Sequence, residues 1–208
     1  MHKTKMIFLL LLIPAFLYSQ EPDVDIEWDI HDMDLYMRGD QTFIISLGTV
    51  FPALFIFRDS ETAINAHNLA RVGMTGSLSY NFFLNANVSL GGEIGFMVLN
   101  TVGENSLFLI PIGLRGGYQF NFWRFEFPIT YTFGISWHRY LDHTYFGIYM
   151  KFGGAIYYRF NPDWSFGLNT AWSWFPQWTG DRNRPAGERR RNAHGNIVEL
   201  TLSARYHF

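Results

Sequence analysis

The feature that most constrains this fold is the segment RFEFPITYTFGISW, residues 124–137, in which a large apolar side chain occupies every second position. The intervening positions are polar, small or proline. A period of two residues indicates a β-strand, with one apolar face and one polar face. At about 3.3 Å per residue the segment extends for roughly 45 Å, long for a soluble strand but sufficient to cross a bilayer at a tilt.

The N-terminus has the pattern of an exported protein. Lys3 and Lys5 precede an apolar run that ends at Leu17, and Ser19 is a small residue suited to cleavage. We therefore predict a secretory signal peptide over residues 1–19. The run is too short for a membrane-spanning helix, and no later segment approaches the roughly twenty apolar residues that such a helix needs. There is no cysteine, so neither disulfides nor a lipidated cysteine are expected.

Acidic residues are concentrated directly after the predicted signal peptide. Without Lys3 and Lys5 the chain has 14 basic against 18 acidic residues, and eight of the acids lie in residues 21–40 beside a single arginine. We predict an acidic periplasmic N-terminal segment, residues 20–40, followed by a mildly basic domain. This charge balance gives little support to nucleic-acid binding, so no nucleic-acid partner is expected.

A repeat organises the rest of the chain. Four segments end in Tyr-x-Phe, spaced 38, 40 and 48 residues apart, at Tyr80 and Phe82, Tyr118 and Phe120, Tyr158 and Phe160, and Tyr206 and Phe208. This spacing suits a repeated two-strand unit. Four further alternating segments, at about 41–57, 87–98, 124–137 and 165–175, complete a set of eight predicted strands.

The predicted links alternate in length. Tight turns are expected near residues 83–86, 121–123 and 161–164, and longer polar links at roughly 58–68, 99–105, 138–144 and 176–196. This arrangement is typical of outer-membrane barrels. The interior of an eight-stranded barrel has no room for an aromatic side chain at every second position, so the apolar face must point outward into lipid. The predicted fold class is all-β: an eight-stranded antiparallel transmembrane β-barrel over residues 41–208.

The alternation over residues 41–208 and the final strand VELTLSARYHF resemble the small bacterial outer-membrane β-barrels of the OmpW-like and OmpA-like group. The resemblance is architectural, and no motif selects one family. It implies a protein of the outer membrane of a diderm bacterium, surrounded by outer-membrane lipid, with its N-terminus in the periplasm. It also implies that the barrel-assembly machinery reads the terminal Phe208, and that the Tyr-x-Phe residues form an interfacial aromatic girdle.

Charged residues occupy the predicted inward face: Arg71, Glu93, Arg115, Arg124, Glu126, Lys151, Arg159, Glu199 and Arg205, with His207. An unpaired charge in a narrow lumen is costly, so we expect Glu93 to pair with Arg115 and Glu126 with Lys151. A plugged polar core is predicted, the alternative being an ion or solute path gated by these pairs. The acidic stretch DVDIEWDIHDMD could cap one mouth of the barrel, or remain a solvated leader.

Prolines interrupt three of the predicted strands. Pro111 and Pro128 each remove a donor from a strand ladder, and we expect a β-bulge at each. Pro52 breaks the alternation of FPALFIF, so the first strand is expected to bend there or to protrude from the bilayer.

One cluster of polar residues is a candidate for catalysis. His138, Asp142 and His143 fall in a predicted loop near Ser136, and some small barrels are lipid acyltransferases or deacylases with a His and a Ser at the outer rim. No nucleophile spacing is diagnostic and the HExxH motif is absent. The sequence therefore predicts no enzyme, metal or cofactor, with a lipid-modifying enzyme kept as an alternative.

The long link at 176–196 is rich in arginine, with Arg182, Arg184, Arg189, Arg190 and Arg191. Arginine favours bidentate contact with phosphate or sulfate, so acidic glycans or lipid phosphates are candidate ligands, and a hydrated loop is the alternative. Two non-enzymatic functions follow as hypotheses. One is OmpW-like passage of small or apolar molecules, and the other is a structural or adhesive surface barrel.

Overall fold

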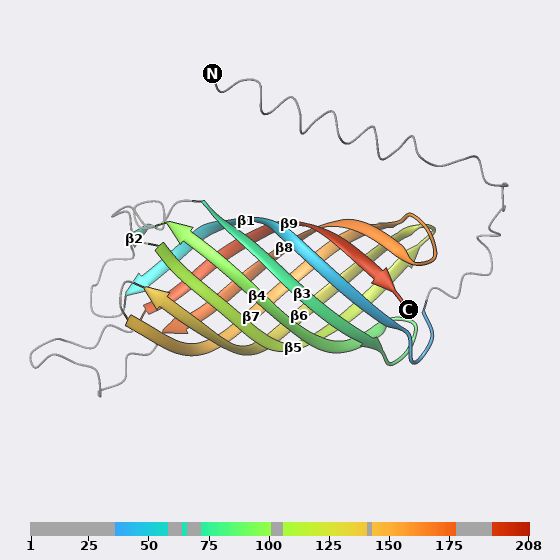
Figure 1. Cartoon of the computed structure of the whole chain (residues 1–208), viewed down its shortest axis with the longest axis horizontal. Helices are drawn as coiled ribbons and strands as arrows, with labels where there is room; N and C mark the ends of the chain where they lie inside the picture. Colours follow the sequence, from blue (N-terminus) through green and yellow to red (C-terminus); the bar gives the residue numbers. More distant parts are fainter. Residues whose placement is uncertain (1–35, 58–63, 66–71, 101–105, 141–142, 178–192) are drawn as a thin grey trace, which may run out of the picture. The chain divides into compact units, whose positions relative to one another are not determined.

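The chain folds into a closed antiparallel β-barrel (Figure 1). The computed structural model describes residues 36–57, 64–65, 72–100, 106–140, 143–177 and 193–208. The wall is made of β1 Gln41–Phe57, β3 Gly73–Phe83, β4 Val88–Asn100, β5 Ser106–Phe122, β6 Phe125–Tyr140, β7 His143–Arg159, β8 Trp164–Gln177 and β9 Ala193–His207. β1 pairs with β9 to close the barrel, and the short β2 Ile64–Asn65 pairs with the end of β1. The predicted fold class is confirmed. The described part of the chain contains no helix able to span a bilayer.

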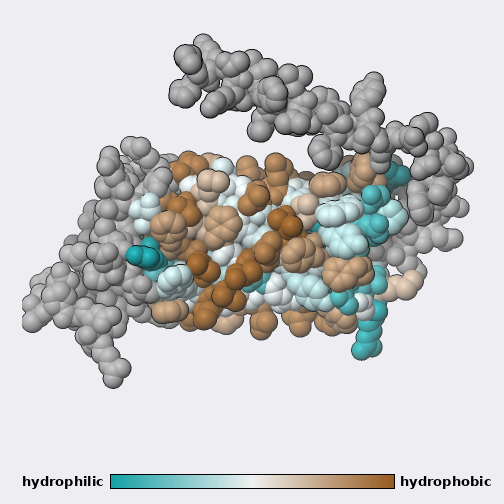
Figure 2. All heavy atoms as spheres, in the orientation of Figure 1, coloured by the Kyte–Doolittle hydropathy of each residue, from teal (hydrophilic) through white to brown (hydrophobic). Residues whose placement is uncertain are grey.

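The two faces of each strand differ as the alternation predicts. In β6, Ile129, Tyr131 and Phe133 are each about 45% exposed on the outer wall, whereas Thr132 and Ser136 are buried inside. Figure 2 shows brown apolar side chains over the wall, with teal hydrophilic residues gathered near the end that carries the tight turns. An aromatic side chain at every second position would not fit inside, because the interior of an eight-stranded barrel is only wide enough to be filled by side chains. The aromatic face is therefore the outer one.

Three tight turns join the strands at one end of the barrel. Trp123 and Arg124 form the two-residue turn between β5 and β6, with Trp123 at φ 56°. In the other two turns Asn85 and Asn161 each accept backbone N–H bonds two and three residues downstream. Asparagine commonly stabilises turns through such side-chain contacts. The Tyr-x-Phe residues lie on the outer wall at this end, all exposed.

The predicted bulges at Pro111 and Pro128 are wrong. The β4–β5 and β5–β6 ladders keep one register past Pro111, and the β5–β6 and β6–β7 ladders keep one register past Pro128. In an antiparallel strand each N–H points to only one neighbour, so a proline interrupts the ladder on one side alone. A register shift does occur between Pro52 and Leu54 in the β1–β9 ladder, where the alternation fails.

Two strands extend further than predicted. β6 continues to Tyr140 and β7 begins at His143, so most of the predicted link at 138–144 is strand. The predicted signal peptide and the acidic stretch DVDIEWDIHDMD lie outside the described residues, as does most of the link at 176–196.

Candidate functional site

The barrel interior is the candidate site, and side chains from the strands fill it in successive layers. The layer nearest the long links is apolar and consists of Val50, Met97, Leu99, Leu109, Tyr149, Phe175 and Ile197. All of these residues are almost completely buried. Packed apolar side chains leave little space for water or ions. This layer closes the end of the lumen that carries the long links.

A central ion network lies below the apolar layer. Nη1 of Arg115 is 2.5 Å from Oε2 of Glu93, and Nζ of Lys151 is 2.9 Å from Oε1 of Glu93 and 3.0 Å from Oε2 of Glu199. Ser173 donates a further hydrogen bond to the Glu199 carboxylate. The network has two cations and two carboxylates from β4, β5, β7 and β9. Such mutual pairing offsets the cost of burying the four charges.

The predicted contact between Glu93 and Arg115 is thus present, but the predicted pairing of Glu126 with Lys151 is wrong. Lys151 lies opposite Thr132 in the β6–β7 ladder, and Thr132 is six residues further along β6 than Glu126. At about 3.3 Å per residue this separates the two levels by roughly 20 Å. Lys151 instead pairs across the lumen with strands that are not its neighbours.

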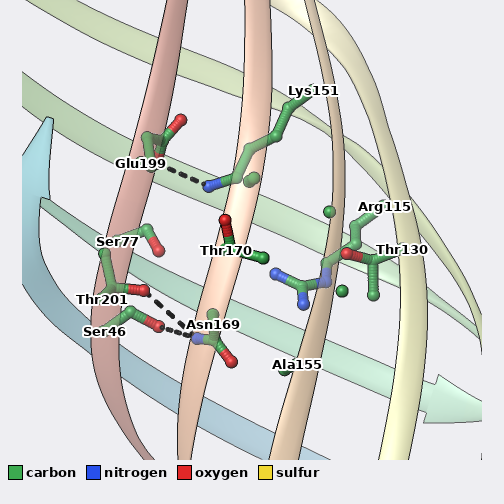
Figure 3. Close-up of a pocket in the computed structure, with 13 residues that line it drawn as sticks. Ser46, Ser77, Arg115, Thr130, Lys151, Ala155, Asn169, Thr170, Glu199 and Thr201 are labelled. Carbon is green, nitrogen blue, oxygen red and sulfur yellow. Dashed lines mark hydrogen bonds and ion pairs between the residues drawn. The ribbon is translucent and has the colours of Figure 1, made fainter. Parts of the chain in front are cut away.

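A layer of hydroxyl and amide groups follows (Figure 3). Nδ2 of Asn169 donates to Oγ of Ser46 and Oγ1 of Thr201, at 3.4 and 3.3 Å. These residues surround a cavity of about 20 Å³, whose wall also includes Arg115 and Lys151. A cavity of this volume holds about one water molecule. It is too small to form a continuous path.

A second ion cluster closes the end that carries the tight turns. Oε2 of Glu126 is 2.7 Å from Nη1 of Arg205, and Oε1 is 3.7 Å from Nη1 of Arg159. Glu126 is fully buried. The Arg205 guanidinium also lies 4.0 Å from the centre of the Tyr157 ring, within the range of a cation–π contact. Two arginines thus surround one carboxylate.

Tyr36, which precedes the first strand, inserts into this cluster. Its ring stacks on Phe83 with 3.9 Å between centroids, and its hydroxyl lies 3.0 Å from Oε2 of Glu126 and 3.1 Å from Nδ1 of His207. Burial raises the pKa of Tyr36 to about 12, so the phenol stays neutral and acts as a donor. Tyr36 is not among the residues that strand periodicity predicts for the lumen. Gly39, at φ 108°, and Asp40 turn the chain just before β1. The Gly-Asp pair is a turn signal in the sequence and could have indicated that the residues before β1 are ordered.

Of the remaining residues predicted to face the lumen, one faces inward, one lies in a turn and one is outside the described residues. His207 faces inward and lies 2.8 Å from Oγ of Ser165. Arg124 does not face inward, because it belongs to a turn and precedes the alternation of β6; its Nη1 lies 3.4 Å from the Tyr158 hydroxyl. Arg71 lies outside the described residues. The structure therefore joins the predicted charges, apart from Arg71 and Arg124, into two interior clusters.

The predicted catalytic residues do not form an accessible loop site. Ser136 and His138 both lie on β6, face inward, are buried and are hydrogen-bonded to each other. His138 also packs edge-on against Phe175 of the apolar layer, at 5.4 Å between ring centroids. His143 begins β7, and Asp142 lies outside the described residues. Within the described ranges no three His, Asp or Glu residues are grouped so as to hold a metal ion.

Sequence comparisons place the chain in a protein family and identify two relatives. A protein-family model matches residues 21–206. The chain belongs to that family. Two curated relatives are proteins of Treponema pallidum (strain Nichols), both described as uncharacterised. One is 29% identical over 133 residues, covering 63% of this chain and 57% of its own length, and the other is 24% identical over 128 residues, covering 58% and 44%. The chain thus spans about half the length of the curated relatives that it matches.

Two solved structures are similar to this chain. Neisserial surface protein A has a TM-score of 0.53 and 11% sequence identity, with 82% of this chain and 97% of that chain covered. OprG from Pseudomonas aeruginosa gives a TM-score of 0.47 at 10% identity, covering 83% of this chain and 97% of its own. The likeness to the first establishes that this protein has the fold of the small eight-stranded outer-membrane barrels.

Proposed function

We propose that this protein is an outer-membrane barrel that serves as a closed membrane anchor, with its N-terminus in the periplasm and its long links at the cell surface. The observation that supports this proposal is the filled interior. An apolar layer, a central ion network and a cluster around Tyr36 follow one another along the described lumen. The function then lies in what the barrel holds at the membrane surface, not in what crosses it.

The outer wall supports the proposed membrane location. Large apolar side chains are exposed on every long strand, including Leu47, Met74, Leu114, Ile135 and Leu202, each more than half exposed. Soluble monomers rarely expose contiguous apolar patches larger than a few hundred Å². Lipid, in contrast, solvates such a belt without penalty.

Passage of small or apolar molecules along the barrel axis has less support. Opening the centre requires separation of Lys151 from both Glu93 and Glu199, and a buried charge without its partner is strongly unfavourable. The apolar layer and Tyr36 obstruct the two ends of the described lumen. A transport function would therefore need a rearrangement at all three levels.

Of the other two hypotheses, the structural or adhesive role fits the described interior better than the lipid-modifying enzyme does. A structural or adhesive role fits a closed anchor, and the arginine-rich link with Arg182 and Arg189 remains its predicted ligand-binding segment. A lipid-modifying enzyme finds no support in Ser136 and His138, because both face the packed interior and neither lines a described cavity. We therefore favour a surface-presenting anchor.

Cysteine accessibility tests the location and the orientation together, because the natural chain has no cysteine. Arg184→Cys in the long link should react with a membrane-impermeant maleimide in intact cells. Asn85→Cys in a tight turn should react only after the outer membrane is permeabilised. Equal labelling of both variants in intact cells, or their recovery outside the outer-membrane fraction, would contradict the proposal.

A further inference from the structure

A groove lies on the outer wall near the end that carries the tight turns. It has a volume of about 810 Å³ and apolar walls that include Ile45, Ile156, Tyr158, Phe166 and Leu202. These residues come from β1, β7, β8 and β9, and each lies within seven residues of its strand's turn end. The groove therefore occupies one half of the apolar belt and does not run its whole length.

The hollow arises where a small side chain replaces a large one. Ala204 points outward between Leu202 and Tyr206, and its cross-strand partners are Phe166 on β8 and Ile45 on β1. Both partners are large, so the Ala204 methyl group forms a floor between two higher walls. A smaller hollow of about 320 Å³ lies elsewhere in the belt, beside Gly154. The outer wall thus has a depression suited to a flexible apolar chain.

A cation lies at the margin of this groove. Nη1 of Arg124 donates to the hydroxyl of Tyr158, which lines the groove, and the Arg124 guanidinium lies 5.9 Å from the centre of the Trp123 ring. Trp and Tyr rings prefer the headgroup level of a bilayer, so these contacts hold Arg124 at that depth. A guanidinium favours phosphate because it can donate two parallel hydrogen bonds.

We propose that this groove is a binding site for one anionic glycerophospholipid. An acyl chain lies along Ala204 between Ile45 and Phe166, and the phosphodiester contacts Arg124 and the Tyr158 hydroxyl. The inference rests on the proposed membrane location and adds a specific lipid partner to it. Charge and shape together select the occupant, because an apolar chain alone would not use Arg124 and a phosphate alone would not use the groove.

Native mass spectrometry of the full refolded chain in detergent tests the site, with dioleoylphosphatidylglycerol as the probe. The wild type should retain one lipid. Arg124→Gln should bind it about tenfold more weakly or worse, since a hydrogen bond to a charged group contributes enough free energy for such a factor. Dioleoylglycerol, which lacks the phosphate, should not be retained.

The groove itself is tested by filling it. Ala204→Phe, or Ala204→Leu if the phenylalanine variant folds poorly, should abolish retention of the lipid. The matched control is Thr170→Phe, which fills a different hollow of about 320 Å³ lined by Phe152 and Trp172. This control should retain the lipid as the wild type does.

The outcomes separate this inference from the proposed function. If the wild type inserts into bilayers but Ala204→Phe binds the lipid as well as it does, the groove is not the site. If Ala204→Phe instead abolishes a dimer, the occupant is a second copy of the chain, and the lipid assignment is wrong. Failure of the wild type to enter bilayers at all would overturn the proposed membrane anchor.

Discussion

The hydroxyl of Tyr36 donates a hydrogen bond to the buried carboxylate of Glu126 at 3.0 Å, although ninety positions separate the two residues in sequence. Tyr36 belongs to the segment before the barrel, and Glu126 belongs to β6. Nη1 of Arg205, from the final strand, lies 3.3 Å from the same hydroxyl. One side chain thus connects the start of the described chain with the middle and the end of the barrel, and it seals one mouth.

Substitution of Tyr36 should therefore destabilise the barrel in two steps. Tyr36→Phe removes the hydroxyl that contacts Oε2 of Glu126 and Nδ1 of His207 and should cost about 1–3 kcal/mol. Tyr36→Ala also removes the stacking on Phe83 and should cost about 3–5 kcal/mol. Urea unfolding in lipid vesicles measures both. Tyr80→Phe is the control, because that hydroxyl is exposed, and it should change stability by less than about 0.5 kcal/mol.

The central network should behave as one unit. Glu199→Gln leaves two cations facing one carboxylate and should cost about 3–5 kcal/mol. Adding Lys151→Met restores neutrality between Glu93 and Arg115, so the double variant should be more stable than the sum of the single variants by about 1 kcal/mol or more. Equilibrium unfolding of the three variants gives this coupling energy.

A charge outside the central network serves as the control for these unfolding measurements. Arg139→Gln changes an exposed charge on β6 and should alter stability by less than about 0.5 kcal/mol. If the effects of Glu199→Gln and Lys151→Met simply add, the two side chains do not form a shared buried network.

Substitution by alanine should have different effects on stability at two glycines of neighbouring strands. A Cβ atom at Gly134 would overlap the backbone of Ile112 and Gly113 on the neighbouring strand, whereas a Cβ at Gly116 meets nothing within 4 Å. Gly134→Ala should therefore destabilise the barrel by about 1–3 kcal/mol or more, as overpacking does. Gly116→Ala should be nearly neutral. Similar unfolding midpoints for the two variants would show that β5 and β6 do not approach closely at Gly134.

The strands could be predicted from the sequence because outward and inward residues alternate without ambiguity. Tyr131 and Thr132 illustrate this, since lipid accepts the aromatic ring and the narrow lumen accepts the small hydroxyl side chain. The absence of a bulge at Pro111 could not be predicted from the sequence. It depends on which neighbouring strand the missing N–H would have faced.

The charge pairs were harder to predict because a barrel brings distant strands together across its lumen. Glu93 and Arg115 lie on neighbouring strands, and that contact follows from sequence order. Lys151 and Glu93 lie three strands apart in the barrel, so their contact cannot be predicted by pairing adjacent strands. Tyr36 lies outside any alternating segment, so periodicity has no means of identifying it. The pairing of Lys151 and the insertion of Tyr36 both depend on how the closed barrel brings distant parts of the chain together.

Single-channel recording of the refolded chain in a planar bilayer is the most direct test of a closed interior. The wild type should show no steady openings. Tyr36→Ala should show none either, because the central ion network and the apolar layer still obstruct the lumen. Steady openings of the wild type would contradict the closed anchor and would restore passage through the barrel as its function.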